Sequence, residues 1–266
     1  MSAALRPVAG EEGLMVSIQF GDSILADVEQ LIGALPDDAV ASPLRSTVPL
    51  VAFWRMPGPR VSQLSATIGV DCAPPIALCF EFPVPVQRGR GKPSFTDLMI
   101  VAASSAVAVE AKFREPPYET VRAWLRSPAE ANRVEVLEGW LDLIRAATGA
   151  EVTAAEVAEL PYQLIHRTAS VCSIPREVRA VVYQVFGNAH HTYYVDILSD
   201  LAGRIGRPPR LGFHVLSCPI ECHQSHADLV QQWKQGARLV GEAVRRELLS
   251  ESLFSFGEPV HHAART

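Results

Sequence analysis

Three ionisable residues, Asp97, Glu110 and Lys112, interrupt an otherwise apolar stretch of the chain. The stretch predicts two short strands, 97–101 and 107–113, joined by a turn of small residues. Antiparallel pairing around a two-residue loop places Asp97 opposite Glu110, and a register slipped by two residues places it opposite Lys112. Residues that are opposite each other or two apart on one strand share a face, so both registers keep the three side chains on the same face. We therefore expect two carboxylates and one ammonium group on one face of a buried hairpin.

Two buried carboxylates repel each other unless a cation offsets their charge. Mg²⁺ suits this role because it binds oxygen ligands, commonly one or two protein carboxylates together with the phosphate oxygens of a substrate. Beside such an ion, Lys112 could orient a water molecule or stabilise charge on a scissile phosphate. The alternative is a surface hairpin with one weak ion pair, and the apolar neighbours of the three residues weigh against it.

A further acid, Glu81, lies within the strand predicted over residues 76–86. Glutamate is seldom buried without a partner. Glu81 is therefore either an additional ligand for the cation or a residue that faces water from an edge strand.

The loop between this strand and the hairpin, QRGRGK, is basic and rich in glycine, and it carries Arg88, Arg90 and Lys92. It is not a nucleotide-binding P-loop, because Val86 and Pro93 stand where that motif requires Gly and Ser or Thr. Two interpretations stay open, a solvated loop and a loop that contacts the phosphate backbone of a nucleic acid.

Further helices and strands follow the hairpin. The segment 161–172 predicts a helix on which Gln163 is about one turn from His166 and Arg167. The other elements expected after the hairpin are a short helix at 118–125, a longer helix that begins near Ser127 and ends at Gly149, strands at 180–186 and 211–217, helices at 190–205 and 227–249, and an unstructured tail from Gly257.

Asp97, followed on the next strand by Glu110-Ala111-Lys112, resembles the signature of the PD-(D/E)XK nuclease superfamily. In that family an Asp, often preceded by Pro, is followed after a hairpin by Glu or Asp, any residue and Lys. Thr96 stands here in the position of the Pro.

The order of elements over residues 76–186 is also similar to the common core of this family. That order is strand, strand with Asp, strand with Glu-x-Lys, helix, strand. Gln163 is similar to a polar residue, frequently Gln, that the family's helix contributes. The resemblance implies an α/β, restriction-endonuclease-like fold, in which a mixed central β-sheet is flanked by helices, with helical additions at both ends.

The function implied by the resemblance is Mg²⁺-dependent hydrolysis of DNA phosphodiester bonds, with Mn²⁺ as a substitute ion. Asp97 and Glu110 would hold the metal with support from Glu81, and Lys112 and Gln163 would act on the attacking water or the phosphate. The expected DNA-binding residues are Arg88, Arg90, Lys92 and Arg167.

Restriction, phage defence and repair are all compatible with this activity. The alternative is a catalytically silent binding or regulatory protein on the same fold. The net charge of −5 favours that alternative, whereas the complete set of Asp, Glu and Lys favours the nuclease. A local basic groove can nevertheless lie on an acidic protein.

The length of 266 residues and the 48% hydrophobic content indicate a single domain over 1–266 with a sizeable core. We divide it into a helical N-terminal segment (14–72), a nuclease-like core (76–186) and a C-terminal helix-strand-helix extension (187–256).

Five cysteines without a secretory signal indicate a reducing, cytoplasmic location. No apolar run reaches the roughly 18 residues of a membrane span, so we expect no membrane partner. The helices outside the core are candidates for a homodimer surface.

Overall fold

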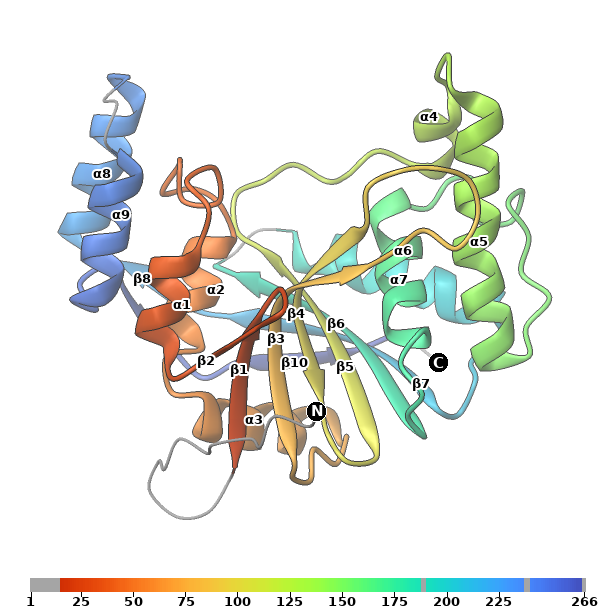
Figure 1. Cartoon of the computed structure of the whole chain (residues 1–266), viewed down its shortest axis with the longest axis horizontal. Coiled ribbons are helices and arrows are strands. Elements are labelled where there is room, and N and C mark those ends of the chain that lie inside the picture. Colours follow the sequence, from red (N-terminus) through yellow and green to blue (C-terminus); the bar gives the residue numbers. More distant parts are fainter. Residues whose placement is uncertain (1–14, 188–189, 237–239, 265–266) are drawn as a thin grey trace.

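A computed structural model of the chain describes residues 15–187, 190–236 and 240–264. Within these residues, a mixed sheet of eight strands forms the middle layer and helices cover both of its faces (Figure 1). The α/β class predicted from the sequence, a mixed central sheet flanked by helices, is confirmed at this level.

The strands of the large sheet are β1 (Val16–Phe20), β2 (Ser23–Leu25), β3 (Ile76–Val84), β4 (Ser94–Val101), β5 (Ser105–Lys112), β6 (Val178–Phe186), β7 (Leu211–Cys218) and β10 (Val260–Ala263). They lie side by side in the order β10-β7-β6-β5-β4-β3-β1-β2. Two short strands, β8 (Ile220–Cys222) and β9 (Phe254–Phe256), form a separate antiparallel pair.

In the part of the chain that the structure describes, one face of the sheet packs against five helices, α1 (Val28–Ala34), α2 (Thr47–Phe53), α3 (Pro57–Ile68), α8 (Gln224–Lys234) and α9 (Val240–Leu249). The other face packs against four helices, α4 (Val121–Leu125), α5 (Glu130–Thr148), α6 (Tyr162–Cys172) and α7 (His191–Arg204). We call these two faces the α1 face and the α6 face.

The predicted hairpin is β4 and β5, and it occupies the centre of the sheet. β4 is antiparallel to both of its neighbours, β3 and β5, whereas β5, β6 and β7 run parallel to one another. Helices α4, α5 and α6 lie in the connection from β5 to β6, as a parallel crossover requires. The hairpin is therefore covered on both sides.

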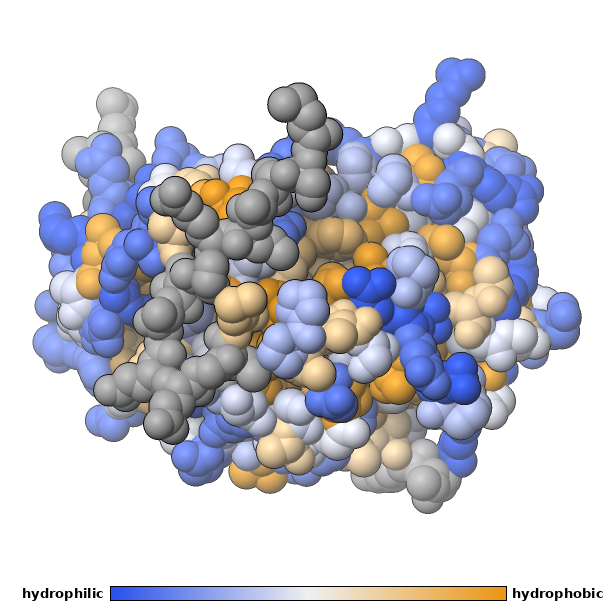
Figure 2. Space-filling model, turned by 60° about the horizontal axis from the view of Figure 1, so that its bottom comes forward, coloured by the Kyte–Doolittle hydropathy of each residue, from blue (hydrophilic) through white to orange (hydrophobic). Residues whose placement is uncertain are grey.

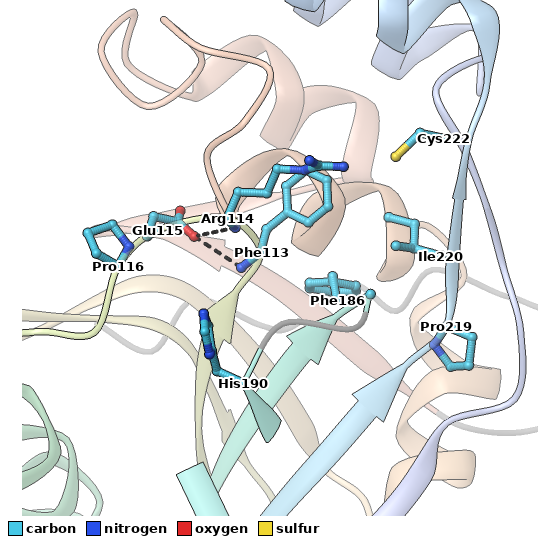
Figure 3. Close-up of a pocket in the computed structure, with 10 residues that line it drawn as sticks. Phe113, Arg114, Glu115, Pro116, Phe186, His190, Pro219, Ile220 and Cys222 are labelled. Carbon is cyan, nitrogen blue, oxygen red and sulfur yellow. Dashed lines mark hydrogen bonds between the residues drawn. The ribbon is translucent and has the colours of Figure 1, made fainter. Parts of the chain in front are cut away.

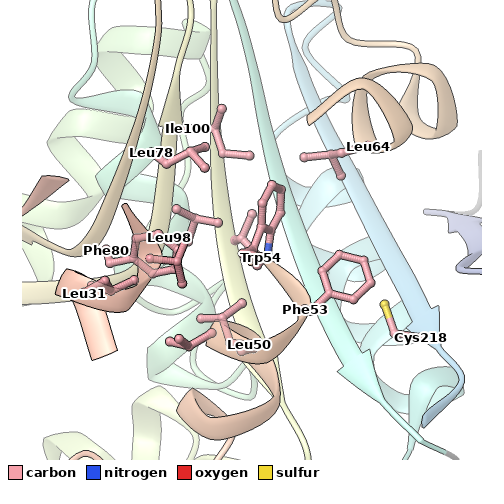
Figure 4. Close-up of a cluster of buried hydrophobic side chains, with 14 of the residues drawn as sticks. Leu31, Leu50, Phe53, Trp54, Leu64, Leu78, Phe80, Leu98, Ile100 and Cys218 are labelled. Atoms are coloured by element: carbon pink, nitrogen blue, oxygen red, sulfur yellow. The ribbon is translucent and has the colours of Figure 1, made fainter. Parts of the chain in front are cut away.

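The side chains of β5 point alternately to the two faces of the sheet, and each face has its own apolar core. Val107 and Val109 belong to the apolar cluster of the α1 face, and Ala106 and Ala108 belong to that of the α6 face. On the α1 face, Trp54 lies among aliphatic side chains of β3 and β4 (Figure 4), and its indole Nε1 donates a hydrogen bond of 3.1 Å to Gln184. The α1 face is thus a packed apolar core.

The ends of the chain differ from the prediction. The N-terminal segment, predicted to be helical, also contributes β1 and β2, and β1 pairs in parallel with β3. The tail predicted to be unstructured contains β10, which pairs with β7 and covers that edge of the sheet. The helix predicted over 227–249 is two helices, α8 and α9, which contact each other. Strands β1 and β10 pair with β3 and β7, which are distant in sequence, so local periodicity does not reveal them. Strand β2 forms a local hairpin with β1 and has only three residues.

The face shown in Figure 2 has apolar side chains near its middle and hydrophilic side chains around them. Scattered apolar residues are normal on a protein surface. In the part of the chain that the structure describes, no helix has the length and apolar composition that crossing a bilayer requires.

Thr96 supplies a first prediction, because its side chain is fully buried and its Oγ1 has no hydrogen-bond partner among the described residues. We expect Thr96→Val to raise the free energy of unfolding by about 1 kcal/mol, since it replaces an unsatisfied hydroxyl by a methyl group of similar size. Thr168→Val is the matched control. Thr168 is equally buried, but its hydroxyl donates to Leu164 O at 2.9 Å, so this substitution should lower stability. Urea unfolding measures both, and a loss of stability in Thr96→Val would contradict the prediction.

Candidate functional site

The register of β4 and β5 brings the three ionisable residues together. Leu98 pairs with Val109, so Asp97 and Glu110 lie opposite each other one step further along the hairpin. Lys112 Nζ is 3.0 Å from Glu110 Oε1. Of the two registers that the sequence allows, the structure has the one that places Asp97 across from Glu110. Glu110 and Lys112 are both buried.

Asp97 is fixed by the backbone of the neighbouring strand. Its Oδ2 accepts a hydrogen bond of 2.8 Å from the amide of Ala111. The side chain stays about one-fifth exposed, more than those of Glu110 and Lys112. Asp97 is thus the member of this group most accessible to solvent.

Helix α6 supplies two further members from positions one turn apart. The amide of Gln163 bridges the hairpin residues: it accepts from Lys112 Nζ at 2.6 Å and donates to Glu110 Oε1 at 2.6 Å. Arg167 forms an ion pair with Glu110 Oε2 through Nε and lies 3.5 Å from Asp97 Oδ1 through Nη2. We call Asp97, Glu110, Lys112, Gln163 and Arg167 the charged cluster.

Proximity of like and unlike charges shifts the pKa values within the charged cluster. Burial and the charge of Glu110 raise the pKa of Asp97 well above its ordinary value. Burial also opposes ionisation of Glu110, but Arg167 and Lys112 outweigh it and lower the pKa of Glu110. Although burial acts against it, the carboxylates raise the pKa of Lys112. Lys112 therefore stays protonated at neutral pH.

A hydrogen-bonded pair next to the charged cluster was not predicted from the sequence. Ser94 Oγ accepts from Arg167 Nη1 at 3.1 Å and lies 2.7 Å from His166 Nδ1. Arg167 Nη1 also lies 3.4 Å from His166 Nδ1, and because a guanidinium only donates, Nδ1 is an acceptor and the imidazole proton is on Nε2. The Ser94 hydroxyl therefore donates to Nδ1. Burial and the charges of Arg167 and Lys112 lower the pKa of His166 well below its ordinary value, so the ring is neutral.

Glu81 lies near the charged cluster but does not complete a metal site. The β3–β4 ladder passes from the pair Phe80–Leu98 to the pair Phe82–Thr96, so Glu81 and Asp97 face each other without pairing, and Glu81 has a positive φ of 49°. Burial raises its pKa. Among the described residues, no three His, Cys, Asp or Glu side chains are placed to hold one ion.

The basic loop between β3 and β4 is attached to α5. Arg88 forms ion pairs of 3.2 Å with Glu135 and Asp142. The side-chain amide of Asn132 bonds both the N–H and the C=O of Arg90, at 2.7 and 2.8 Å. The loop is therefore held in one position, and Arg88 is directed to acidic residues of α5.

A cleft of about 440 Å³ separates the basic loop from α6. Arg90 and Lys92 line one side, and Gln163, His166 and Arg167 line its α6 side. Arg88 does not line it. Of the four basic residues expected to bind DNA, three therefore border the same cleft.

A second cavity, of about 780 Å³, lies beyond the carboxyl ends of β5 and β6 (Figure 3). Phe113 and Phe186 line it, and the Glu115 carboxylate closes a turn by accepting from the amides of Phe113 and Arg114. It contains none of the residues predicted to bind metal or DNA.

Fold and site together define an α/β protein with a buried charged cluster on the central hairpin of its sheet. The chain belongs to the family described as a domain of unknown function, DUF6946, whose model matches residues 25–237. No curated protein and no solved structure matches the chain.

The pKa of Asp97 gives a prediction for stability against pH. Above the ordinary carboxyl pKa of about 3.9 and below its raised value, Asp97 holds a proton in the folded state but not in the unfolded state, so stability falls as pH rises through this window. The substitution Asp97→Asn removes this fall in stability, because the side chain no longer titrates. Its amide oxygen can still accept the hydrogen bond from the Ala111 amide. The difference in free energy of unfolding, variant minus wild type, should increase with pH. Urea unfolding between about pH 4 and pH 8 measures it, and parallel curves would refute the shift.

Contact between Gly139 of α5 and the basic loop gives a third prediction. A Cβ at Gly139 would lie 2.9 Å from the backbone nitrogen of Arg88, so Gly139→Ala should push the loop away from α5. We expect a loss of about 1–3 kcal/mol and faster hydrogen exchange at the Arg90 amide. Gly203→Ala is the control, since no atom lies within 4 Å of a Cβ there. Unchanged exchange at Arg90 in Gly139→Ala would show that the loop is not held by this contact.

Proposed function

We propose that this protein is a Mg²⁺-dependent nuclease that hydrolyses DNA phosphodiester bonds. The observation that carries the proposal is the convergence of Asp97, Glu110 and Lys112 on one face of a central hairpin, with Gln163 bonded to two of them. Acid, amide and ammonium groups are the side chains that metal-assisted phosphodiester hydrolysis uses.

The arrangement of strands supports a restriction-endonuclease-like core within residues 76–186. β3, β4 and β5 form an antiparallel meander, and β6 adds in parallel to β5 after α6. This is the order of elements that the resemblance to PD-(D/E)XK nucleases implies, and each residue of the motif lies on the strand expected for it.

The donor groups of Asp97 and Glu110 fit Mg²⁺. Both are carboxylates, two are enough when water and phosphate complete the coordination, and Asp97 is accessible. Burial and then the neighbouring charge of Glu110 raise the pKa of Asp97, and a divalent cation would favour its ionised form. When bound, the ion would polarise a phosphate oxygen and favour the hydroxide form of a bound water. Glu81 would act on this site through its charge.

Lys112 acts as a charged hydrogen-bond donor. Its raised pKa keeps Nζ protonated, so it does not accept a proton from the attacking water. Glu110 and Gln163 each bond Nζ and hold it next to the carboxylates. There it would stabilise the negative charge that develops on the phosphate.

One observation favours the alternative, a catalytically silent binding or regulatory protein on the same fold. Arg167 contacts an oxygen of both Asp97 and Glu110, so side chains already offset much of the acidic charge. In an active nuclease, metal binding must compete with Arg167 or use the remaining carboxylate lone pairs. In a silent protein, Arg167 is a permanent partner of the acids.

Cleavage of plasmid and linear DNA with Mg²⁺ or Mn²⁺ tests the proposal. We expect Glu110→Gln and Lys112→Met each to lower the cleavage rate by about 10²–10³-fold, because each removes a group that acts on the phosphate or its metal. Chelation of the metal should abolish cleavage. Glu159→Gln is the matched control, since Glu159 is an exposed acid paired with Arg122 away from the charged cluster.

Absence of cleavage, together with no heat of Mg²⁺ binding in calorimetry, would favour the silent protein. Cleavage that survives both cluster substitutions would place the activity at another site and refute the residue assignment.

A cytoplasmic location is part of the proposal. The five cysteines are free, and four of them are buried. Free thiols persist where the compartment is reducing.

A further inference from the structure

The cleft beside the basic loop has a cationic lining on a protein with a net charge of −5. Arg90, Lys92, Arg133 and Arg167 border it, and no Asp or Glu is among the described residues that line it. Arg90 and Lys92 are exposed. A concentration of positive charge on an acidic protein favours a polyanionic ligand at this place.

Aromatic side chains line the same cleft. Trp124 and Tyr162 stack on each other at 3.7 Å, and the guanidinium of Arg133 lies 5.0 Å from the Trp124 ring. Phe95 and Tyr118 are different, because they are 45% and 46% exposed and keep ring surface for a ligand. Large exposed aromatic side chains in a cleft are typical of binding sites.

Basic and exposed aromatic residues together favour a nucleic acid with unpaired bases. Backbone phosphates bind the basic side chains, and unstacked bases stack on the aromatic rings. Bases inside a duplex are already stacked on each other, so they cannot reach Phe95 or Tyr118 without being extruded.

The cleft leads to the charged cluster. Its α6 side includes Gln163, His166 and Arg167, and Gln163 and Arg167 both contact Glu110. Phe95 precedes Asp97 by two residues on β4. A strand bound along the cleft would thus have a phosphate near Asp97.

We propose that the cleft binds single-stranded DNA, with bases stacked on Phe95 and Tyr118 and phosphates held by Arg90 and Lys92. That the bound strand is also the substrate rests on the proposed nuclease function. The cleft then selects unpaired ends, flaps or single strands over an intact duplex.

Fluorescence anisotropy with a labelled oligothymidine and a blunt duplex of the same length, both in the presence of a chelator, tests binding without cleavage. We expect tighter binding of the single strand. Phe95→Ala and Tyr118→Ala should each weaken it by about 5- to 100-fold, the range found for the loss of one stacking platform. Lys92→Ala should weaken it and reduce its salt dependence.

Two matched controls separate the cleft from general effects. Trp233→Ala removes an aromatic side chain on α8 that is 41% exposed, and Arg210→Ala removes an exposed basic residue that pairs with Glu177 and does not line the cleft. Both should bind the single strand as the wild type does. Circular dichroism establishes that the variants are folded, which is expected because Phe95 and Tyr118 are exposed.

Equal affinity for both DNAs, or no loss in Phe95→Ala and Tyr118→Ala, would overturn the inference. Failure of the two proposals is distinguishable. Metal-dependent cutting of duplex DNA without single-strand binding would refute this inference and leave the nuclease intact. Single-strand binding that needs Phe95 and Tyr118, without cutting by any metal, would support the inference and refute the nuclease.

Discussion

Charge compensation inside the sheet is the constraint on which the rest of this structure depends. Glu110 is buried on a central strand, and its burial is tolerated because Lys112, Gln163 and Arg167 all bond it. Removing one partner of a buried ion pair typically costs about 3–5 kcal/mol, because the other charge is left without compensation. This requirement fixes α6 against β4 and β5, and α6 in turn forms one side of the basic, aromatic cleft.

The same compensation bears on function. Asp97 is the acid that the cluster compensates least: it is the most exposed, its contact with Arg167 is the longest, and its pKa is raised. A site in which one carboxylate is firmly paired and its neighbour is not has a defined place for an additional positive charge. The active nuclease and the catalytically silent protein differ in one respect. In the nuclease a divalent cation binds beside Asp97, whereas in the silent protein Arg167 alone offsets the charge of Asp97.

The basic residues of the loop between β3 and β4 have different roles, which depend on where each lies in the fold. Arg88, Arg90 and Lys92 belong to one short loop, yet Arg88 binds acidic residues of α5 while Arg90 and Lys92 border the cleft. Gly139 has no side chain, and this allows the backbone of Arg88 to approach α5 closely. A Cβ at Gly139 would collide with the loop. One arginine thus positions the loop, and the other two basic residues are left to a ligand.

The sequence by itself determined the hairpin and the face shared by Asp97, Glu110 and Lys112. These follow from a side-chain period of two along a strand and from a short turn, which are local properties. It also determined the helix that carries Gln163 and Arg167. Only the tertiary structure decided that Arg167 binds the two acids, that Ser94 bonds His166, that Arg88 turns away from the cleft, and that β1 and β10 extend the sheet. Each of these joins residues tens of positions apart, and a partner at that separation is chosen by packing and charge in the folded chain, which local periodicity does not encode.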